Sequence, residues 1–100
     1  MSGGNVAINL CVLLWARPGA EAALAAYEDK VLALFDDHGC TLLQRVRTDG
    51  ADGAPTEVQI ITVPSQAALD AYLADERRTA LAAERDAAVA RTDIHRVELV

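Results

Sequence analysis

The residues from Val6 to Trp15 have the sequence VAINLCVLLW and are apolar on both faces of the β-strand that they predict. Alternate side chains of a strand point to opposite faces of its sheet. Val12 and Leu14 then lie on one face, and Cys11 and Leu13 lie on the other. An antiparallel sheet with helices over one face commonly has polar residues on its second face. This stretch therefore predicts a strand that needs cover on both faces.

The rest of the chain predicts three further strands and two helical regions. Apolar residues at three- and four-residue spacing indicate the first helix, and the pair His38 and Gly39 indicates its end. A turn-rich segment, DGADG, separates two strands that should form a hairpin. The predicted elements after the first strand are a helix over 20–37, strands over 41–48 and 56–63, helices over 66–73 and 76–90, and a strand over 94–100.

This order of elements, βαββαβ, is that of the α+β ferredoxin-like sandwich. Right-handed crossovers place the first and third strands in the centre of a four-stranded antiparallel sheet, with both helices on one face. One hundred residues suffice for a single core. We therefore expect residues 1–100 to form one domain.

The helix-free face of this sheet would be a large exposed apolar patch. Val58 and Ile60 of the third predicted strand add to it, opposite Ile61 and Val63. At roughly 25 cal/mol per Å², covering several hundred Å² contributes on the order of ten kcal/mol before association costs. Two-fold self-association is the commonest oligomeric arrangement. We therefore predict a homodimer formed through the sheet face.

Charge and cysteine content narrow the class of protein. The formal net charge is −6, whereas a nucleic-acid partner would require a basic surface. No apolar stretch is long enough to span a membrane, and no basic segment of a signal peptide precedes the first strand. Cys11 and Cys40 are isolated, which is typical of a reducing compartment. The sequence thus predicts a cytoplasmic protein that binds neither nucleic acid nor membrane.

Candidate acid–base and anion-binding residues lie on the predicted hairpin and at one helix end. Arg45, Glu57 and Gln59 share a side of the sheet if the hairpin register is even, and could bind and deprotonate a ligand. The alternative is a row of cross-strand pairs that fixes the register. His38 is a candidate general base near neutral pH, or else it stabilises the negative end of its helix. His95 is expected at the surface of the last strand.

A second group of candidates lies on the predicted helices. Tyr72, with Tyr27 and Trp15, could line a cavity between helices and sheet, or simply fill the core. Arg78 and Arg85 have acidic neighbours on their helix, which chiefly indicates a solvated, mutually paired surface. They are seven residues apart on one helical stripe, so one of them could point inward. The sequence has no phosphate loop, metal-ligand cluster, nucleophile elbow or dinucleotide fingerprint. We therefore expect no metal and no cofactor.

Several short motifs are spread over nearly the whole chain. They are Trp15-Ala16-Arg17-Pro18-Gly19, Tyr27-Glu28, His38-Gly39, Arg45, Glu57-Val58, Pro64-Ser65, and Tyr72 with Asp75 and Arg78. Together they resemble an uncharacterised family of the dimeric α/β-barrel superfamily, whose members include antibiotic-biosynthesis monooxygenases and muconolactone isomerase. The resemblance implies a ferredoxin-like fold, two sheets packed back to back across a dimer, and often a small-molecule pocket between sheet and helices. It does not imply one activity.

Two functions remain open on the sequence. The first is a cofactor-independent enzyme, isomerase- or monooxygenase-like, or a binder of a carbonyl- or phenol-bearing metabolite. The second is a non-catalytic dimerisation or effector-sensing module. Haem is not expected, because haem-degrading relatives use a histidine that the second helix here lacks. A polar cavity between sheet and helices favours the first function, and a filled interior favours the second.

Overall fold

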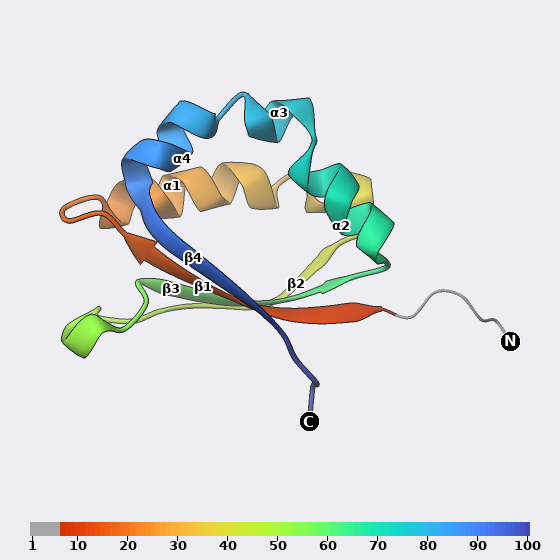
Figure 1. Cartoon of the computed structure of the whole chain (residues 1–100), viewed down its shortest axis with the longest axis horizontal. Helices are drawn as coiled ribbons and strands as arrows, with labels where there is room; N and C mark the ends of the chain where they lie inside the picture. Colours follow the sequence, from red (N-terminus) through yellow and green to blue (C-terminus); the bar gives the residue numbers. More distant parts are fainter. Residues whose placement is uncertain (1–6) are drawn as a thin grey trace, which may run out of the picture.

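The computed structural model describes residues 7–100 and has a four-stranded antiparallel sheet beneath a layer of helices (Figure 1). The strands are β1 (Ile8–Ala16), β2 (Thr41–Arg47), β3 (Glu57–Val63) and β4 (Val89–Arg96). The helices are α1 (Glu21–Leu32), α2 (Gln66–Leu73), α3 (Glu76–Thr79) and α4 (Ala82–Ala88), with the short 3-10 helices η1 (Phe35–His38) and η2 (Ala51–Gly53). Val6, the predicted first residue of β1, lies outside the described residues.

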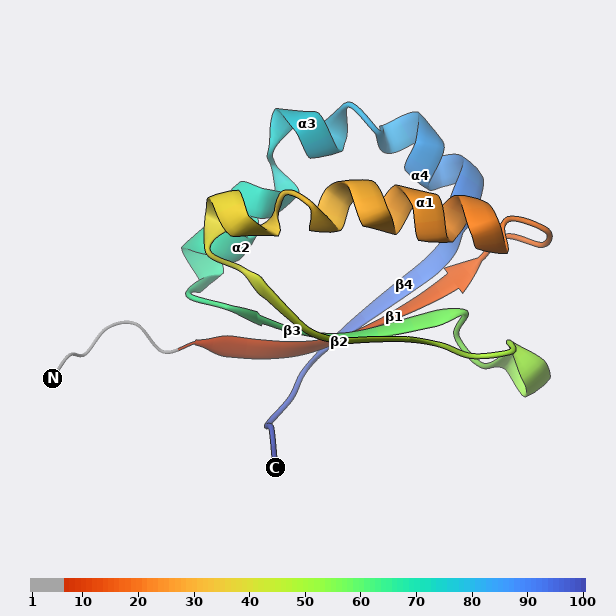
Figure 2. The same cartoon turned by 180° about the vertical axis from the view of Figure 1, so that it is seen from behind.

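The sheet has the strand order β2-β3-β1-β4, so the first and third strands are central as predicted. The helices α1 to α4 lie over one face of the sheet, and α1 runs beside α4 in both views (Figures 1 and 2). The ferredoxin-like α+β fold is thereby confirmed. The hairpin register pairs Arg45 with Gln59 and Arg47 with Glu57, and a register shift lies between Leu42 and Gln44.

The core lies between the sheet and the helices. Leu10, Val12 and Leu14 alternate along β1 toward the helices, and all three are buried. The apolar stripe of α1 packs over these side chains. Its residues recur at three- and four-residue spacing, as the sequence predicts. This stripe consists of the buried residues Leu24, Tyr27 and Val31.

Three predicted boundaries are wrong. The first helix ends at Leu32, and the chain continues as η1, where buried Phe35 packs edge-to-face on Tyr72 with ring centroids 4.9 Å apart. The helix predicted over 76–90 is two short helices, because its alanine-rich stretch offers few large apolar residues to hold one axis. The last strand is Val89–Arg96 rather than the predicted 94–100. Three of its residues, Arg91, Thr92 and Asp93, are polar, and an edge strand with one uncovered face accepts them.

No helix or strand among residues 7–100 covers the opposite face of the sheet (Figure 1). The side chains on this face are largely apolar. Leu13 of β1 pairs with Val58 of β3, which pairs with Val46 of β2. Cys11 and Ile60 form a second apolar pair beside them. Val46 is 49% exposed in the single chain. The sheet is therefore apolar on both faces, as the first strand predicts.

Candidate functional site

A cavity of about 60 Å³ lies between the sheet and the helices. Apolar side chains make up most of its wall, and a few polar side chains converge on it, as in many small-molecule sites. Leu73 and Ile94 line the cavity and are 38% and 52% exposed, so it opens to solvent between α2 and β4. The polar lining residues are Glu28, Gln59, Tyr72, Arg78, Arg85 and Thr92.

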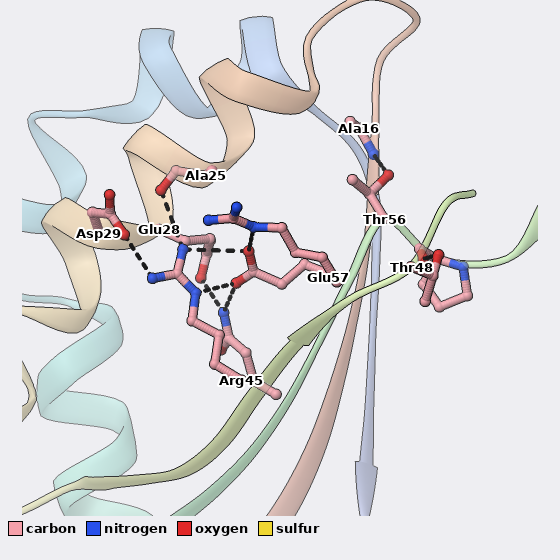
Figure 3. Close-up of polar contacts among 11 residues, drawn as sticks. Ala16, Ala25, Glu28, Asp29, Arg45, Thr48, Thr56 and Glu57 are labelled. Carbon is pink, nitrogen blue, oxygen red and sulfur yellow. Dashed lines mark hydrogen bonds and ion pairs between the residues drawn. The ribbon is translucent and has the colours of Figure 1, made fainter.

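An ion-pair network built around Glu57 lies beside this cavity (Figure 3). The Glu57 side chain is fully buried and accepts hydrogen bonds from Arg45, whose Nε lies 2.8 Å and Nη2 3.3 Å from its two oxygens. The same guanidinium reaches α1, where it donates to Asp29 at 2.6 Å and to the carbonyl of Ala25 at 3.2 Å. The bidentate geometry fixes the hairpin against α1.

Gln59 joins this network to the cavity. Its Nε2 donates to Glu57 Oε2 at 2.7 Å and to Glu28 Oε1 at 2.8 Å, and the side chain is buried. One amide therefore bridges two buried carboxyl groups. Of the pair, only Glu28 lines the cavity.

Burial raises the pKa of the Glu28 carboxyl above its usual range, because the charged form is poorly solvated. The hydrogen bond from Gln59 lowers this pKa, and the nearby negative charge of Glu57 raises it. Arg78 and Arg45 lower it by smaller amounts. A carboxyl group with a raised pKa at a cavity wall is suited to proton transfer nearer neutral pH.

The raised pKa of Glu28 predicts a stability that falls with rising pH. An unfolded glutamate loses its proton near pH 4.3, whereas folded Glu28 holds it to higher pH. Between these two pKa values the folded state binds more protons, so the free energy of unfolding decreases. We therefore compare the free energy of unfolding of Glu28→Gln with that of wild type at each pH. We expect the difference to favour Glu28→Gln more at pH 7 than at pH 4. Urea denaturation at both pH values measures this, with Glu21→Gln, exposed on the same helix, as the control.

Arg78 carries a buried donor with no acceptor. Its Nε is buried and lacks a hydrogen-bond partner among the residues that the structure describes. The guanidinium lies over the Tyr72 ring at 5.2 Å from the centroid. Burial raises the pKa of Tyr72 to about 12, which the positive charge of Arg78 only partly offsets, so this phenol stays protonated at neutral pH. A buried donor without a partner is rare, and this one belongs to a residue that lines the cavity.

Arg85 and Thr92 complete the polar lining. Arg85 Nη2 donates to Thr92 Oγ1 at 3.2 Å, linking α4 to β4. The helical spacing predicts that one of Arg78 and Arg85 points inward, and in the structure both residues line the cavity. Neither Tyr27 nor Trp15 lines it. Tyr27 is core, and Trp15 lies on the opposite side of β1, where its ring packs under Arg91 at 4.5 Å.

His38 lies outside the cavity lining, at the end of η1. Its Nε2 is 2.8 Å from Asp75 Oδ2, and Asp75 caps α3 by accepting from the backbone N–H of Arg77. The Arg77 side chain also bonds Asp75 and Asp37. These bonds hold the pKa of Asp75 well below its usual range, with Arg77 as the largest cause and His38 the next. His38 thus ties η1 to α3, while His95 is exposed on β4.

The structure brings Arg45, Glu57 and Gln59 together on the helix-facing side, as an even register predicts. Glu28 is the site residue that sequence reasoning missed. Its signal is positional: Glu28 lies four residues after Leu24 and three before Val31, on the buried stripe of α1. A charged residue on such a stripe is rarely buried without a specific partner.

Two negative observations accompany this geometry. No helix within residues 7–100 combines the length and apolar character required to cross a bilayer. The described part of the chain holds no cluster of three or more His, Cys, Asp or Glu side chains placed to bind a metal ion.

Comparisons with known proteins identify the fold class. No family model matches the chain, and no curated protein matches it. Among solved structures, a protein of unknown function from Rhodopseudomonas palustris is 22% identical, with a TM-score of 0.77, over 97% of this chain and 86% of that one. A candidate antibiotic biosynthesis monooxygenase from Caulobacter crescentus is 18% identical, with a TM-score of 0.76, over 96% and 92%.

A third similar structure is a dabb family protein with a ferredoxin-like fold from Mesorhizobium loti. It is 14% identical, with a TM-score of 0.67, over 97% of this chain and 99% of that one. The class defined by these comparisons is the ferredoxin-like α+β fold. The ferredoxin-like fold that the resemblance in the sequence implies is therefore confirmed, and at these sequence identities the similarities show the fold alone.

Proposed function

We propose that this protein binds a small carbonyl- or phenol-bearing compound in the cavity between sheet and helices, and acts on it by isomerase- or monooxygenase-like chemistry without a cofactor. The observation that carries this proposal is the buried, unpartnered Nε of Arg78, a residue that lines the cavity. An oxygen of a carboxylate, phenol or enolate would satisfy this donor with a charge-assisted hydrogen bond. Tyr72 and Gln59 line the same cavity and would orient the ligand.

The cavity limits the size of the ligand. A cavity needs a volume of roughly 10–15 Å³ to hold one water molecule. The cavity volume of about 60 Å³ therefore corresponds to a compound of only a few non-hydrogen atoms. Larger ligands would require Leu73 and Ile94 to move aside at the surface. We therefore place short oxo acids and small phenols first among the candidates.

Three other residues predicted from the sequence would act on the ligand only indirectly in this proposal. Arg45 and Glu57 do not line the cavity, and would act on the ligand only through Gln59 and Glu28. His38 lies behind Tyr72, with ring centroids 6.0 Å apart, and would position that ring rather than touch the ligand.

We further propose that two copies associate through the helix-free face of the sheet. The row Val46–Val58–Leu13 supplies an apolar centre, while β4 contributes Arg91 and Asp93 at one edge. An apolar centre with a polar rim is the usual anatomy of a protein interface. Because β1 supplies both this face and the cavity wall, dimerisation would also stiffen the site. The free thiols of Cys11 and Cys40 support a cytoplasmic location.

The second candidate function is a non-catalytic dimerisation or effector-sensing module. The observation in its favour is the small volume of the cavity, since ligand pockets usually exceed about 300 Å³. This candidate predicts a dimer whose thermal stability does not respond to small acids.

A thermal-shift screen with pyruvate, 2-oxobutyrate, acetylacetone and phenol tests the proposed function. We expect at least one compound to raise the Tm in a concentration-dependent manner. At 100 times its Kd, such a compound should add about 2.7 kcal/mol to the free energy of unfolding. Arg78→Met should weaken this binding roughly 10- to 100-fold, because the ligand loses a charged donor. Arg77→Met, whose ion pairs lie outside the cavity, is the matched control. No response to any compound would favour the second candidate.

A further inference from the structure

Two buried carboxyl groups share one amide donor group at the edge of the cavity. Glu28 is 7% exposed, Glu57 is 0% exposed, and Gln59 Nε2 donates to both. Since an amide NH₂ has two donors, this arrangement uses both of them. The two carboxyl groups are thus held in fixed positions relative to each other.

Their surroundings are unequal. Glu57 accepts three hydrogen bonds, two from Arg45 and one from Gln59, and Arg47 Nε lies 3.9 Å away. Glu28 accepts only the bond from Gln59 among the described residues. Glu57 is therefore a paired carboxylate outside the cavity lining, whereas Glu28 has free acceptor capacity at the cavity wall. Such a division is how paired carboxyl groups acquire different acid–base roles.

We propose that Glu28 is the catalytic residue that exchanges a proton with an enolisable carbonyl compound in the cavity, and that Arg78 holds the oxygen of that compound. In this assignment Glu57, Arg45 and Gln59 are positioning residues. The inference rests on the proposed function, because it requires a ligand in the same cavity.

The proton transfer needs no further reactant. The Glu28 carboxylate takes the proton from the carbon next to the carbonyl group. The electron pair of the broken C–H bond forms the C=C bond, and the carbonyl π pair moves onto oxygen. Arg78 Nε–H donates to the resulting enolate oxygen. The oxygen electron pair then re-forms the C=O bond while the carboxylic acid of Glu28 returns a proton to carbon. Return to the same carbon gives hydrogen exchange, and return to another carbon of a conjugated compound gives an isomer.

The charged groups around Glu28 support this assignment. Glu57 on β3 raises the pKa of Glu28, while Arg78 on α3 and Arg45 on β2 lower it, and burial outweighs both arginines. Arg85 on α4 and the protonated phenol of Tyr72 on α2 line the same cavity. A carboxyl group whose pKa lies nearer the working pH is a more efficient general base than one at the usual value.

The test is hydrogen–deuterium exchange of the compound that the thermal-shift screen identifies among pyruvate, 2-oxobutyrate and acetylacetone. Proton NMR in D₂O follows loss of the signal next to the carbonyl group. We expect the wild type to accelerate this loss and Glu28→Gln to lower the accelerated rate at least about 100-fold, since general acid–base groups contribute roughly 10²–10⁴-fold. Glu28→Gln keeps the shape of the side chain and removes a buried charge, so it should fold.

The control is binding itself. Glu28→Gln should still respond to the compound in the thermal-shift assay, because Arg78 is intact. A compound that binds the wild type without exchange, or that exchanges equally in Glu28→Gln, overturns the assignment of Glu28 and leaves the proposed function standing. If no compound binds, the proposed function fails and this inference fails with it.

The positioning role of Glu57 has a separate measurement. Glu57→Gln removes the negative charge that raises the pKa of Glu28. The exchange rate rises with pH as Glu28 loses its proton, and the midpoint of this rise should lie at a lower pH in Glu57→Gln than in wild type. A purely structural role would reduce the rate without moving the profile. An unmoved midpoint in a folded Glu57→Gln protein overturns the positioning role.

Discussion

Replacement of Arg45 by Met is expected to lower the free energy of unfolding by about 3–5 kcal/mol, because it leaves a buried carboxylate without its main partner. Glu57 has no exposed side-chain surface, and both its oxygens accept from Arg45. The substitution also removes the bonds from this guanidinium to Asp29 and to the Ala25 carbonyl. Urea denaturation followed by circular dichroism measures the effect.

Arg47→Met is the matched control for this experiment. Arg47 lies on the same strand and the same face, but its side chain is 63% exposed and its Nε is 3.9 Å from Glu57. Exposed ion pairs contribute below about 1 kcal/mol, so the control should be nearly neutral. Equal losses in the two variants would mean that the arginines share the Glu57 charge, and that the bidentate pair is not the main support of the hairpin.

The network around Glu57 shows what the sequence predicts and where its information ends. The period-two spacing of Arg45 and Arg47, and of Glu57 and Gln59, places each pair on one side of its strand. Whether the two sides coincide depends on the register, and the irregularity between Leu42 and Gln44 has no sequence signature here. A slip of one residue would have reversed the grouping.

The residues that line the cavity are harder to predict from the sequence than the strands of the sheet. Helical spacing predicts that one of Arg78 and Arg85 points inward, and both line the cavity. Glu28 was missed as a site residue because an acidic side chain on a helix is usually solvated. Only its tertiary partners, Gln59 above all, make its burial tolerable. The helix breaks near Leu32 and Leu81 likewise follow from packing rather than from glycine or proline.

The two-sided apolar character of β1 links the cavity to the predicted dimer. On one side Leu10, Val12 and Leu14 form the cavity floor. On the other side Cys11 and Leu13 belong to the helix-free face. If both proposals hold, the same strand serves a ligand site and an interface, and a change on the outer face would reach the cavity through its backbone.

Val46→Asp is expected to convert the dimer into single chains at micromolar concentration. Val46 is 49% exposed in the single chain, so aspartate there should leave the fold intact. In the proposed dimer the same position is covered, and two-fold symmetry would place the buried charge twice in one interface. Burying an unpaired charge costs several kcal/mol, which predicts a Kd at least about 100-fold weaker. Light scattering coupled to size-exclusion chromatography measures the mass of each variant.

Leu73→Asp is the control, since Leu73 is an apolar residue with 38% exposure that lies on α2, over the other face of the sheet. We expect this variant to keep the mass of the wild type. The dimer also predicts a Tm that rises with protein concentration in wild type and is independent of it in Val46→Asp, because association stabilises only the folded chain. If the wild-type protein had the mass of one chain at micromolar concentration, the proposed dimer would be wrong. The apolar residues on both faces of β1 would then lack this explanation.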